Sequence, residues 1–340
     1  MSAVPPSPAT PELPPSPSPA PAPAPAPAPA DAPPQPGPPS PAARTGRAGH
    51  VVRAVSALLA AVVCGLGTWQ LVRFAVGTAR GQRLDQLILS AAQADGSFVA
   101  QLVFPAISTV TVPVIIAILL AAGVLCIARR RVGLLAQITA MVIGANLTTQ
   151  VVKHLLVPRD VLAEGIEVTP NSFPSGHTTL AMAAAVAIVL AVPDRLRSLA
   201  AVLAAGWAVG AGVGTMAEGW HRPSDVAGAV LVVGAWTFLM LALDAAAAAA
   251  GGPAAPARPR AREGAPARRS GAAGAVLLIA VAIVAVAGAL LAGAAIPTPL
   301  QLEDIAHQRT AYAASILAIL AGTSALVGTV LVLRVDHTSR

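Results

Sequence analysis

The hydrophobic and polar positions of this chain are segregated into eight long apolar stretches separated by shorter polar segments. The stretches cover residues 54–77, 108–127, 133–152, 177–193, 198–217, 226–247, 272–294 and 311–333. Nearly all reach the ~20 residues that a helix needs to cross a bilayer. Their runs of Ala, Leu and Val lack the alternation of membrane-barrel strands, and an open sheet would leave its backbone groups unpaired in lipid. The pattern therefore predicts an all-α fold, a polytopic transmembrane helical bundle.

The composition excludes an ordinary soluble domain and limits the chemistry available. Hydrophobic residues make up 55% of the chain and charged residues only 11%, whereas a soluble protein needs more polar side chains to wet its surface. The net charge of +7 could indicate nucleic acid, but cations between apolar stretches are better explained as membrane anchors. We therefore expect a membrane partner and no nucleic acid. Cys64 and Cys126 both lie inside apolar stretches and form no metal-binding pattern.

Composition also divides the chain into four parts. Residues 1–50 are rich in Pro and Ala and predict a disordered tail, because such a segment buries too little apolar surface to offset its ordering entropy. Residues 51–247 form a six-span membrane core. Residues 248–271, rich in Gly, Pro and Arg, form a linker, and residues 272–334 form a C-terminal two-helix membrane segment. We expect this pair either to pack against the core or to mediate assembly into a homo-oligomer, and the sequence leaves both open.

The placement of basic residues predicts the orientation in the cell membrane. Most of the 22 Lys and Arg residues fall on the cytoplasmic side if the N-terminus is placed there, in agreement with the positive-inside rule. Both termini and the 248–271 linker are then cytoplasmic in this multi-pass protein. The segments 153–176 and 218–225 then lie on the extracytoplasmic face, and these two segments contain most of the reactive side chains.

The first motif of chemical interest is "NSFPSGH", which ends at His177 and opens directly into an apolar stretch. Ser175 suits the N-cap of a helix beginning near Gly176, and the free N–H groups at such a helix start favour an anion. Gly176 lets a ligand approach the backbone closely. His177 would then stand beside the bound anion. The alternative is a helix cap with an interfacial histidine.

Two further clusters have the same predicted membrane depth. In "GWHRPSD", His221 and Asp225 are four residues apart, and with Pro223 in the first turn they share one helix face. A carboxylate on one ring nitrogen leaves the other available as a nucleophile. In "KHLLVPRD", Lys153 and Arg159 could bind phosphate oxygens. The alternatives are an interfacial His–Asp pair and two cations that snorkel to the interface.

Taken in order, these clusters resemble the type-2 phosphatidic acid phosphatase superfamily, which includes lipid phosphate phosphatases, polyprenyl diphosphate phosphatases and vanadium haloperoxidases. The resemblance covers about residues 55–247 and is carried by "PSGH" and "WHRPSDVAGA". It implies that His221 attacks phosphorus, that Asp225 orients it, and that His177 protonates the leaving group. The phosphate-binding groups implied are Lys153, Arg159, Ser175 and Gly176. It also implies that no metal or other cofactor is needed.

The chain departs from the family pattern at two places. Arg159 follows Lys153 after five residues rather than six and comes after Pro158 instead of before a proline. Where the family usually has Ser-Arg, this chain has Gly214 and Thr215, and Arg222 is a candidate substitute phosphate ligand.

Three functions are compatible with these residues. The first is an integral-membrane hydrolase that removes phosphate from a lipid phosphate or diphosphate at the outer face through a phosphohistidine. The second is a catalytically weak or inactive pseudophosphatase, or a lipid-binding scaffold. A transporter is a third, but it predicts ionisable groups near the middle of the membrane, and the apolar stretches contain none there.

Overall fold

The computed structural model describes residues 41–96, 112–164, 166, 171–251 and 265–334, and all regular structure within these ranges is helical. The long helices are α1 (Pro41–Leu71), α2 (Ala79–Gln93), α4 (Val112–Ala128), α5 (Val132–Val151), α6 (Gly176–Ala191), α7 (Arg197–Ala217), α8 (Pro223–Ala249), α9 (Ala265–Ala294) and α10 (Ile305–Arg334). Short π-helical turns, η1 (Val72–Val76) and η2 (Val152–Leu156), extend α1 and α5, and the 3₁₀ turn η3 (Asp194–Leu196) precedes α7.

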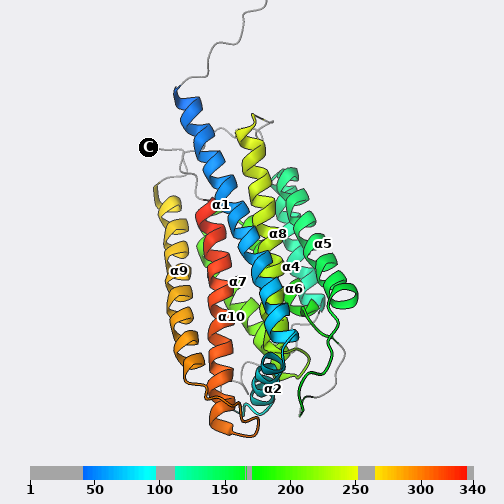
Figure 1. Ribbon diagram of the computed structural model, residues 1–340. Coiled ribbons are helices and arrows are strands. Elements are labelled where there is room, and N and C mark those ends of the chain that lie inside the picture. Colours follow the sequence, from blue (N-terminus) through cyan, green and yellow to red (C-terminus); the bar gives the residue numbers. More distant parts are fainter. Residues whose placement is uncertain (1–40, 97–111, 165, 167–170, 252–264, 335–340) are drawn as a thin grey trace, which may run out of the picture. The chain divides into compact units, whose positions relative to one another are not determined.

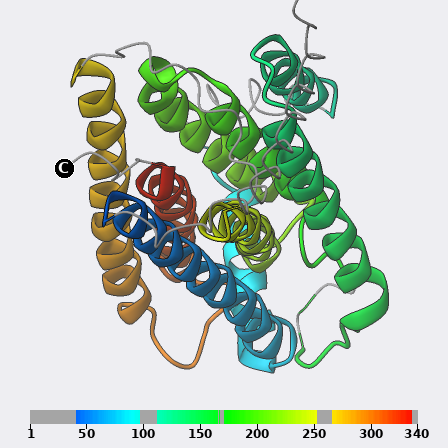
Figure 2. The same cartoon turned by 90° about the horizontal axis from the view of Figure 1, so that it is seen from above.

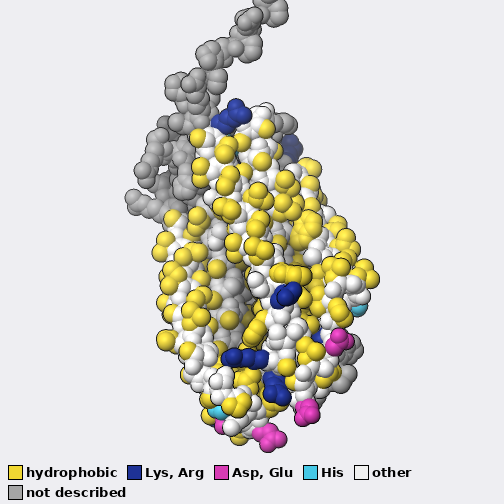
Figure 3. Space-filling view, viewed as in Figure 1, with side chains coloured by type: hydrophobic (Ala, Val, Ile, Leu, Met, Phe, Trp, Pro, Cys, Tyr) yellow, Lys and Arg dark blue, Asp and Glu magenta, His cyan; other side chains and the backbone are white. Residues whose placement is uncertain are grey.

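The prediction of an all-α, polytopic membrane bundle is confirmed. Within the described ranges, six helices are long and apolar enough to cross a bilayer: those built on α1, α5, α7, α8, α9 and α10. The shorter apolar helices α4 and α6 correspond to the two remaining predicted spans. Residues 108–111 of the second predicted span lie outside the described residues. Figure 3 shows hydrophobic side chains covering most of the flank of the bundle, as expected for a surface in contact with lipid.

Two predicted boundaries differ from those observed. Helix α1 begins at Pro41, so residues 41–50 of the predicted tail are helical, while residues 1–40 lie outside the described part of the chain. Helix α9 begins at Ala265, inside the predicted linker, and residues 252–264 are not described. Both helices therefore extend beyond their apolar stretches, because a helix continues through polar positions until a residue or a contact stops it.

Helix α2 was not expected from the sequence, because this stretch is too short and too polar to cross a bilayer. Thr78 caps the helix by accepting a hydrogen bond at its Oγ1 from Gly81 N at 3.0 Å. One face is apolar: Leu87, Ile88, Ala91 and Ala92 are buried in a cluster shared with α7, α8 and α10. Gln82 and Asp85 are also buried, so α2 brings polar groups into the protein interior.

Helix α8 lies at the centre of the bundle and contacts α1, α5, α6 and α10 (Figure 2). The C-terminal hairpin of α9 and α10 packs against this arrangement, with α10 touching α2, α7 and α8. Figure 1 shows the first residue of α1 and the last residue of α10 at one end of the bundle and α2 at the other. Helices α6 and α8 both begin at the α2 end, and the residues before them carry the two histidine motifs.

Candidate active site

The loop before α6 is tied to the end of α5 by a single amide side chain. Asn171 donates from Nδ2 to the carbonyls of Lys153 at 3.0 Å and Val157 at 2.7 Å, and its Oδ1 accepts a hydrogen bond from Phe173 N. The Phe173 ring is fully buried against α8, where a Cβ added to Gly228 would lie 2.5 Å from it. The absence of a side chain at Gly228 therefore lets the "PSGH" loop pack directly on α8.

Ser175 is the N-cap of α6, as predicted. Its Oγ accepts a hydrogen bond from Thr178 N at 3.2 Å, and its own N–H donates to the carbonyl of Asp225 at 2.9 Å. The starts of α6 and α8 are thereby joined through their backbones. Gly176 begins the helix, and His177 in its first turn is exposed.

The turn between α7 and α8 places His221. Gly219 has a φ of 73°, a left-handed conformation that glycine adopts without the steric penalty of a Cβ. The chain reverses there, and both Trp220 N and His221 N donate to the carbonyl of Thr215, at 3.0 and 3.1 Å. The Thr215 hydroxyl donates to Gly212 O. Thr215 thus contributes a backbone acceptor that orients the segment before His221.

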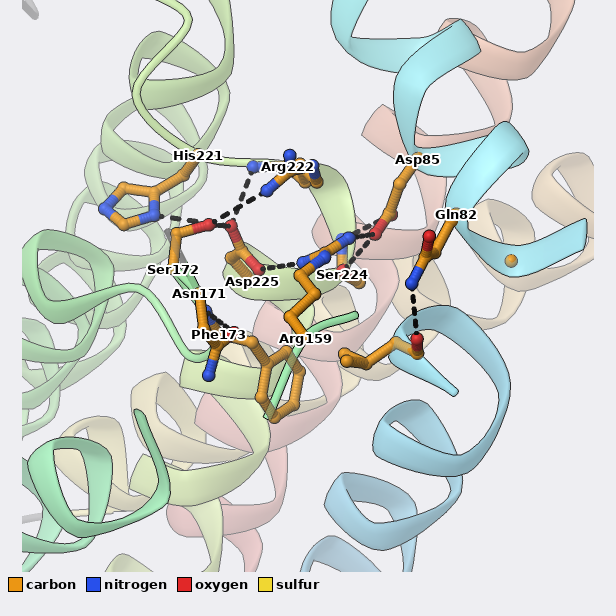
Figure 4. A network of polar contacts seen from close by, with 12 residues as sticks. Gln82, Asp85, Arg159, Asn171, Ser172, Phe173, His221, Arg222, Ser224 and Asp225 are labelled. Carbon is orange, nitrogen blue, oxygen red and sulfur yellow. Dashed lines mark hydrogen bonds and ion pairs between the residues drawn. The ribbon is translucent and has the colours of Figure 1, made fainter. Parts of the chain in front are cut away.

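Asp225 is completely buried and is held by donors on two sides (Figure 4). Its Oδ2 accepts hydrogen bonds from Ser172 Oγ at 2.5 Å and from Arg222 N at 3.0 Å. The same oxygen lies 3.5 Å from His221 Nδ1, which is longer than an ordinary N–H···O hydrogen bond. The carboxylate therefore faces one ring nitrogen of His221 and leaves Nε2 for another partner. The two residues do not share a helix face as predicted, because His221 precedes α8, which begins at Pro223.

The two histidines of the separate motifs converge at this end of the bundle. The ring centroids of His177 and His221 are 6.1 Å apart, and the His177 ring lies 5.4 Å from that of Trp220. His221 is buried, whereas His177 is exposed. Lys153, in η2, is near enough to interact electrostatically with both His177 and Asp225. One buried and one accessible imidazole thus stand beside a cation and the start of α6.

Arg159 and Arg222 are directed toward other protein groups. Arg159 is held between two carboxylates, with Nη2 2.9 Å from Asp85 Oδ2 and Nη1 3.5 Å from Asp225 Oδ1. Arg222 is buried, and its Nη1 donates to Ser172 Oγ at 3.3 Å. Both guanidinium groups were predicted to bind phosphate. In this structure, each lies in the layer of groups that surrounds Asp225.

Asp85, Ser172 and Ser224 belong to this network although no role was expected for them from the sequence. Asp85 accepts hydrogen bonds from Ser224 Oγ at 2.6 Å and from Ser224 N at 3.2 Å. Burial raises the pKa of Asp85 to about 6, and the nearby Asp225 adds to the rise, while Arg159 and Ser224 oppose it. The apolar period of residues 84–92 could have indicated the helix that carries Asp85. Ser172 offered no comparable signal.

The distribution of acidic, cysteine and histidine side chains bears on metal binding. Within the described ranges, no three such side chains gather in an arrangement that could hold a metal ion. The groups present at the site are imidazoles, cations, hydroxyls, backbone amides and the two carboxylates of Asp85 and Asp225.

Comparison with known proteins finds one family that part of the chain resembles. Residues 133–249 match the family model of the PAP2 superfamily, and this segment contains Lys153, His177, His221 and Asp225. No curated protein and no solved structure matches the chain. The match begins in α5 and ends with α8, so α1, α2, α9 and α10 lie outside it. Residues 133–249 of this multi-pass membrane protein are thus similar to the PAP2 superfamily, and this similarity supports membership of that superfamily and suggests a phosphatase-type hydrolase of lipid phosphates.

Proposed function

We propose that this protein is a metal-independent membrane phosphatase that hydrolyses a lipid phosphate or diphosphate through a phosphohistidine at His221. The convergence of His177 and His221, with ring centroids 6.1 Å apart, is the observation that carries the proposal. An attacking nitrogen approaches phosphorus to ~3–3.5 Å, and a general acid reaches the leaving oxygen over ~2.6–3.2 Å. We propose that one phosphoryl group lies between the two rings, with His221 on its attacking side and His177 beside the leaving oxygen.

In the first step, Nε2 of His221 attacks phosphorus. The N–P bond forms as the bond from phosphorus to the leaving oxygen breaks, and protonated His177 donates its proton to that oxygen. Asp225 faces Nδ1 at 3.5 Å, which keeps the proton on Nδ1 and stabilises the positive charge that develops on the ring. The dephosphorylated lipid then leaves.

In the second step, water replaces the lipid. Neutral His177 takes a proton from the water as its oxygen attacks phosphorus, and the N–P bond breaks with its electron pair returning to Nε2 of His221. Inorganic phosphate is released, and both histidines regain their starting protonation states. His177 thus acts as the acid in the first step and as the base in the second, while His221 is first the nucleophile and then the leaving group.

The groups proposed to bind the phosphoryl oxygens are Lys153, Ser175 and Gly176. Lys153 interacts electrostatically with His177, and Ser175 and Gly176 are at the start of α6, where helix N–H groups favour an anion. Arg159 and Arg222 would join them only by giving up contacts with Asp85, Asp225 or Ser172. Such donors lower the barrier because they stabilise the negative charge that develops on the equatorial oxygens in the transition state.

We further propose that the site faces the extracytoplasmic side and that both termini are cytoplasmic. The basis is the distribution of arginine along the sequence. The start of α1 and the end of α10 lie at the end of the bundle opposite α2 (Figure 1), as this orientation requires. A lipid headgroup at the interface could then reach His177 while its tails remain in the bilayer.

The test is phosphate release by purified protein in mixed micelles containing dioleoyl phosphatidate or a polyprenyl diphosphate. We expect the wild type to release phosphate and His221→Ala to release none. His154→Ala is the matched control, because His154 is exposed at the same end of the bundle and has no place in the proposed mechanism. Equal release by wild type and His221→Ala would exclude the phosphohistidine mechanism.

A lipid-binding protein without turnover is the second candidate function, and two observations favour it. Thr215 replaces the usual arginine, and Arg159 is paired with two carboxylates. Loss of one charge-assisted contact to phosphate would cost ~1.5–3 kcal/mol, or about ten- to a hundredfold in rate. This candidate predicts that the wild type binds phosphatidate vesicles and releases no phosphate from either lipid.

A further inference from the structure

Asp85 joins the site from a helix that lies outside the family match. Helix α2 precedes residues 133–249 in the sequence, yet Asp85 is only 4% exposed and contacts two residues of the matched segment. Ser224 donates to it from both Oγ and the backbone N–H, and Arg159 donates from Nη2. A buried carboxylate is stable only when such donors surround it, and here all of them belong to the site region.

The same turn of α2 also holds the loop that carries Arg159. Gln82 Nε2 donates to the carbonyl of Asp160 at 2.7 Å, and Gln82 Oε1 accepts from Leu162 N at 3.1 Å. Gln82 is 2% exposed. The backbone after Arg159 and the guanidinium itself are therefore both fixed by one face of α2.

This double attachment sets the position of the guanidinium relative to Asp225. Arg159 Nη1 and Asp225 Oδ1 are buried, face each other at 3.5 Å, and have no hydrogen-bond partner within the described residues. The other carboxylate oxygen, Oδ2, faces Ser172 and His221. Arg159 thus faces one oxygen of the carboxylate while His221 faces the other (Figure 4).

We propose that Asp85 is a positioning residue of this site, which acts with Ser224 to hold Arg159 against Asp225 and thereby orients Asp225 toward His221. The proposal rests on the phosphatase function proposed above. It assigns α2 a part in the site that the family match does not include. It also changes the role expected for Arg159, from a phosphate ligand to a second positioning residue that acts through Asp225.

The charges around Asp225 give this proposal a specific signature. Asp85, Arg159 and Asp225 together carry one negative charge when both carboxyls are ionised. The other charged or titratable groups near Asp225 are Arg222, Lys153 and His221, with His177 beyond His221. Removing the charge of Asp85 leaves Arg159 to neutralise Asp225 alone. The cationic form of the His221 ring then experiences a less negative potential than in wild type and is less stabilised.

The experiment compares wild type, Asp85→Asn, Asp85→Glu and Glu303→Gln across the pH range, in the full-length protein with phosphatidate as substrate. We expect Asp85→Asn to lower kcat about tenfold and to move the acid limb of the kcat/KM profile to lower pH by ~0.5 unit. Asp85→Glu keeps the charge and should leave the limb in place. Glu303→Gln removes an exposed carboxylate from the α9–α10 connection and should change neither quantity.

A purely structural role for Asp85 would reduce the fraction of folded enzyme equally at every pH and would leave the limb unmoved. An unmoved limb in an active Asp85→Asn enzyme therefore overturns the proposal and leaves the phosphatase function intact. If Asp85→Asn does not fold, Ser224→Ala provides the test, because loss of the Oγ donor should produce a smaller shift in the same direction. Absence of phosphate release by the wild type overturns the phosphatase function, and this proposal with it.

Discussion

Substitution of Ser172 by Ala tests whether the orientation of Asp225 limits the reaction. Ser172 Oγ donates to Asp225 Oδ2 at 2.5 Å and accepts a hydrogen bond from Arg222 Nη1 at 3.3 Å. Ser172→Ala removes both contacts and leaves the buried carboxylate with the Arg222 amide as its one short donor among the described residues. The carboxylate can then turn toward Arg159, which lies 3.5 Å from its other oxygen.

The size of the effect follows from the type of bond that is lost. A hydrogen bond to a charged group contributes ~1.5–3 kcal/mol. If this energy is lost only in the transition state, when His221 gains positive charge opposite Asp225, kcat falls by about 10- to 150-fold. KM should change little, because the hydroxyl is engaged by Asp225 and Arg222. Ser172→Thr retains the hydroxyl and should recover most of the loss.

The assay is steady-state phosphate release in mixed micelles, with kcat and KM determined separately for each variant. Ser56→Ala is the control, because it removes a hydroxyl from an exposed position on α1 and should leave both constants unchanged. A Ser172→Ala enzyme with wild-type kcat, in a preparation where His221→Ala is inactive, would refute the reasoning. In that case the hydroxyl would have no part in orienting the nucleophile.

Three further predictions follow from the same contacts. Gly228→Ala should destabilise the protein by ~1–3 kcal/mol and lower activity, because the new Cβ would lie 2.5 Å from the buried Phe173 ring; a thermal-unfolding midpoint equal to that of wild type would contradict this. Lys153→Met should raise KM for phosphatidate about tenfold or more through loss of a charge-assisted contact, and an unchanged KM would remove Lys153 from the binding groups. Because the pKa of Asp85 is raised from 3.8 to about 6, the native state binds the proton of the Asp85 carboxyl more tightly than the unfolded state does. Its contribution to the free energy of unfolding, ~3 kcal/mol, is present below pH ~4 and is lost as the pH rises through ~6. The thermal-unfolding midpoint of wild type should therefore decrease, relative to that of Asp85→Asn, as the pH rises from 4 to 7. Parallel plots of the two midpoints against pH would contradict the prediction.

The sequence alone indicated the class of fold and the two histidine motifs. Long apolar stretches can satisfy their backbone in lipid only as helices, so each predicted span corresponds to a helix. That His221 and Asp225 belong to one motif was also predictable, but their expected place on one helix face was wrong, because His221 precedes α8 and meets Asp225 through the turn before that helix. The cap at Ser175 is similarly local, since an N-cap hydroxyl bonds to the turn that it precedes.

The tertiary structure determined which distant groups meet at the site. No local rule relates Asp85 to Ser224, which lie 139 positions apart, or shows that Arg159 would pair with carboxylates. Helix α2 reaches the site because its apolar face is buried against α7, α8 and α10, and its polar residues are carried inward with it. A sequence pattern shows which side chains can ionise or donate. Packing determines which of them meet, because a buried charge must find its partner among the groups that the fold brings within reach.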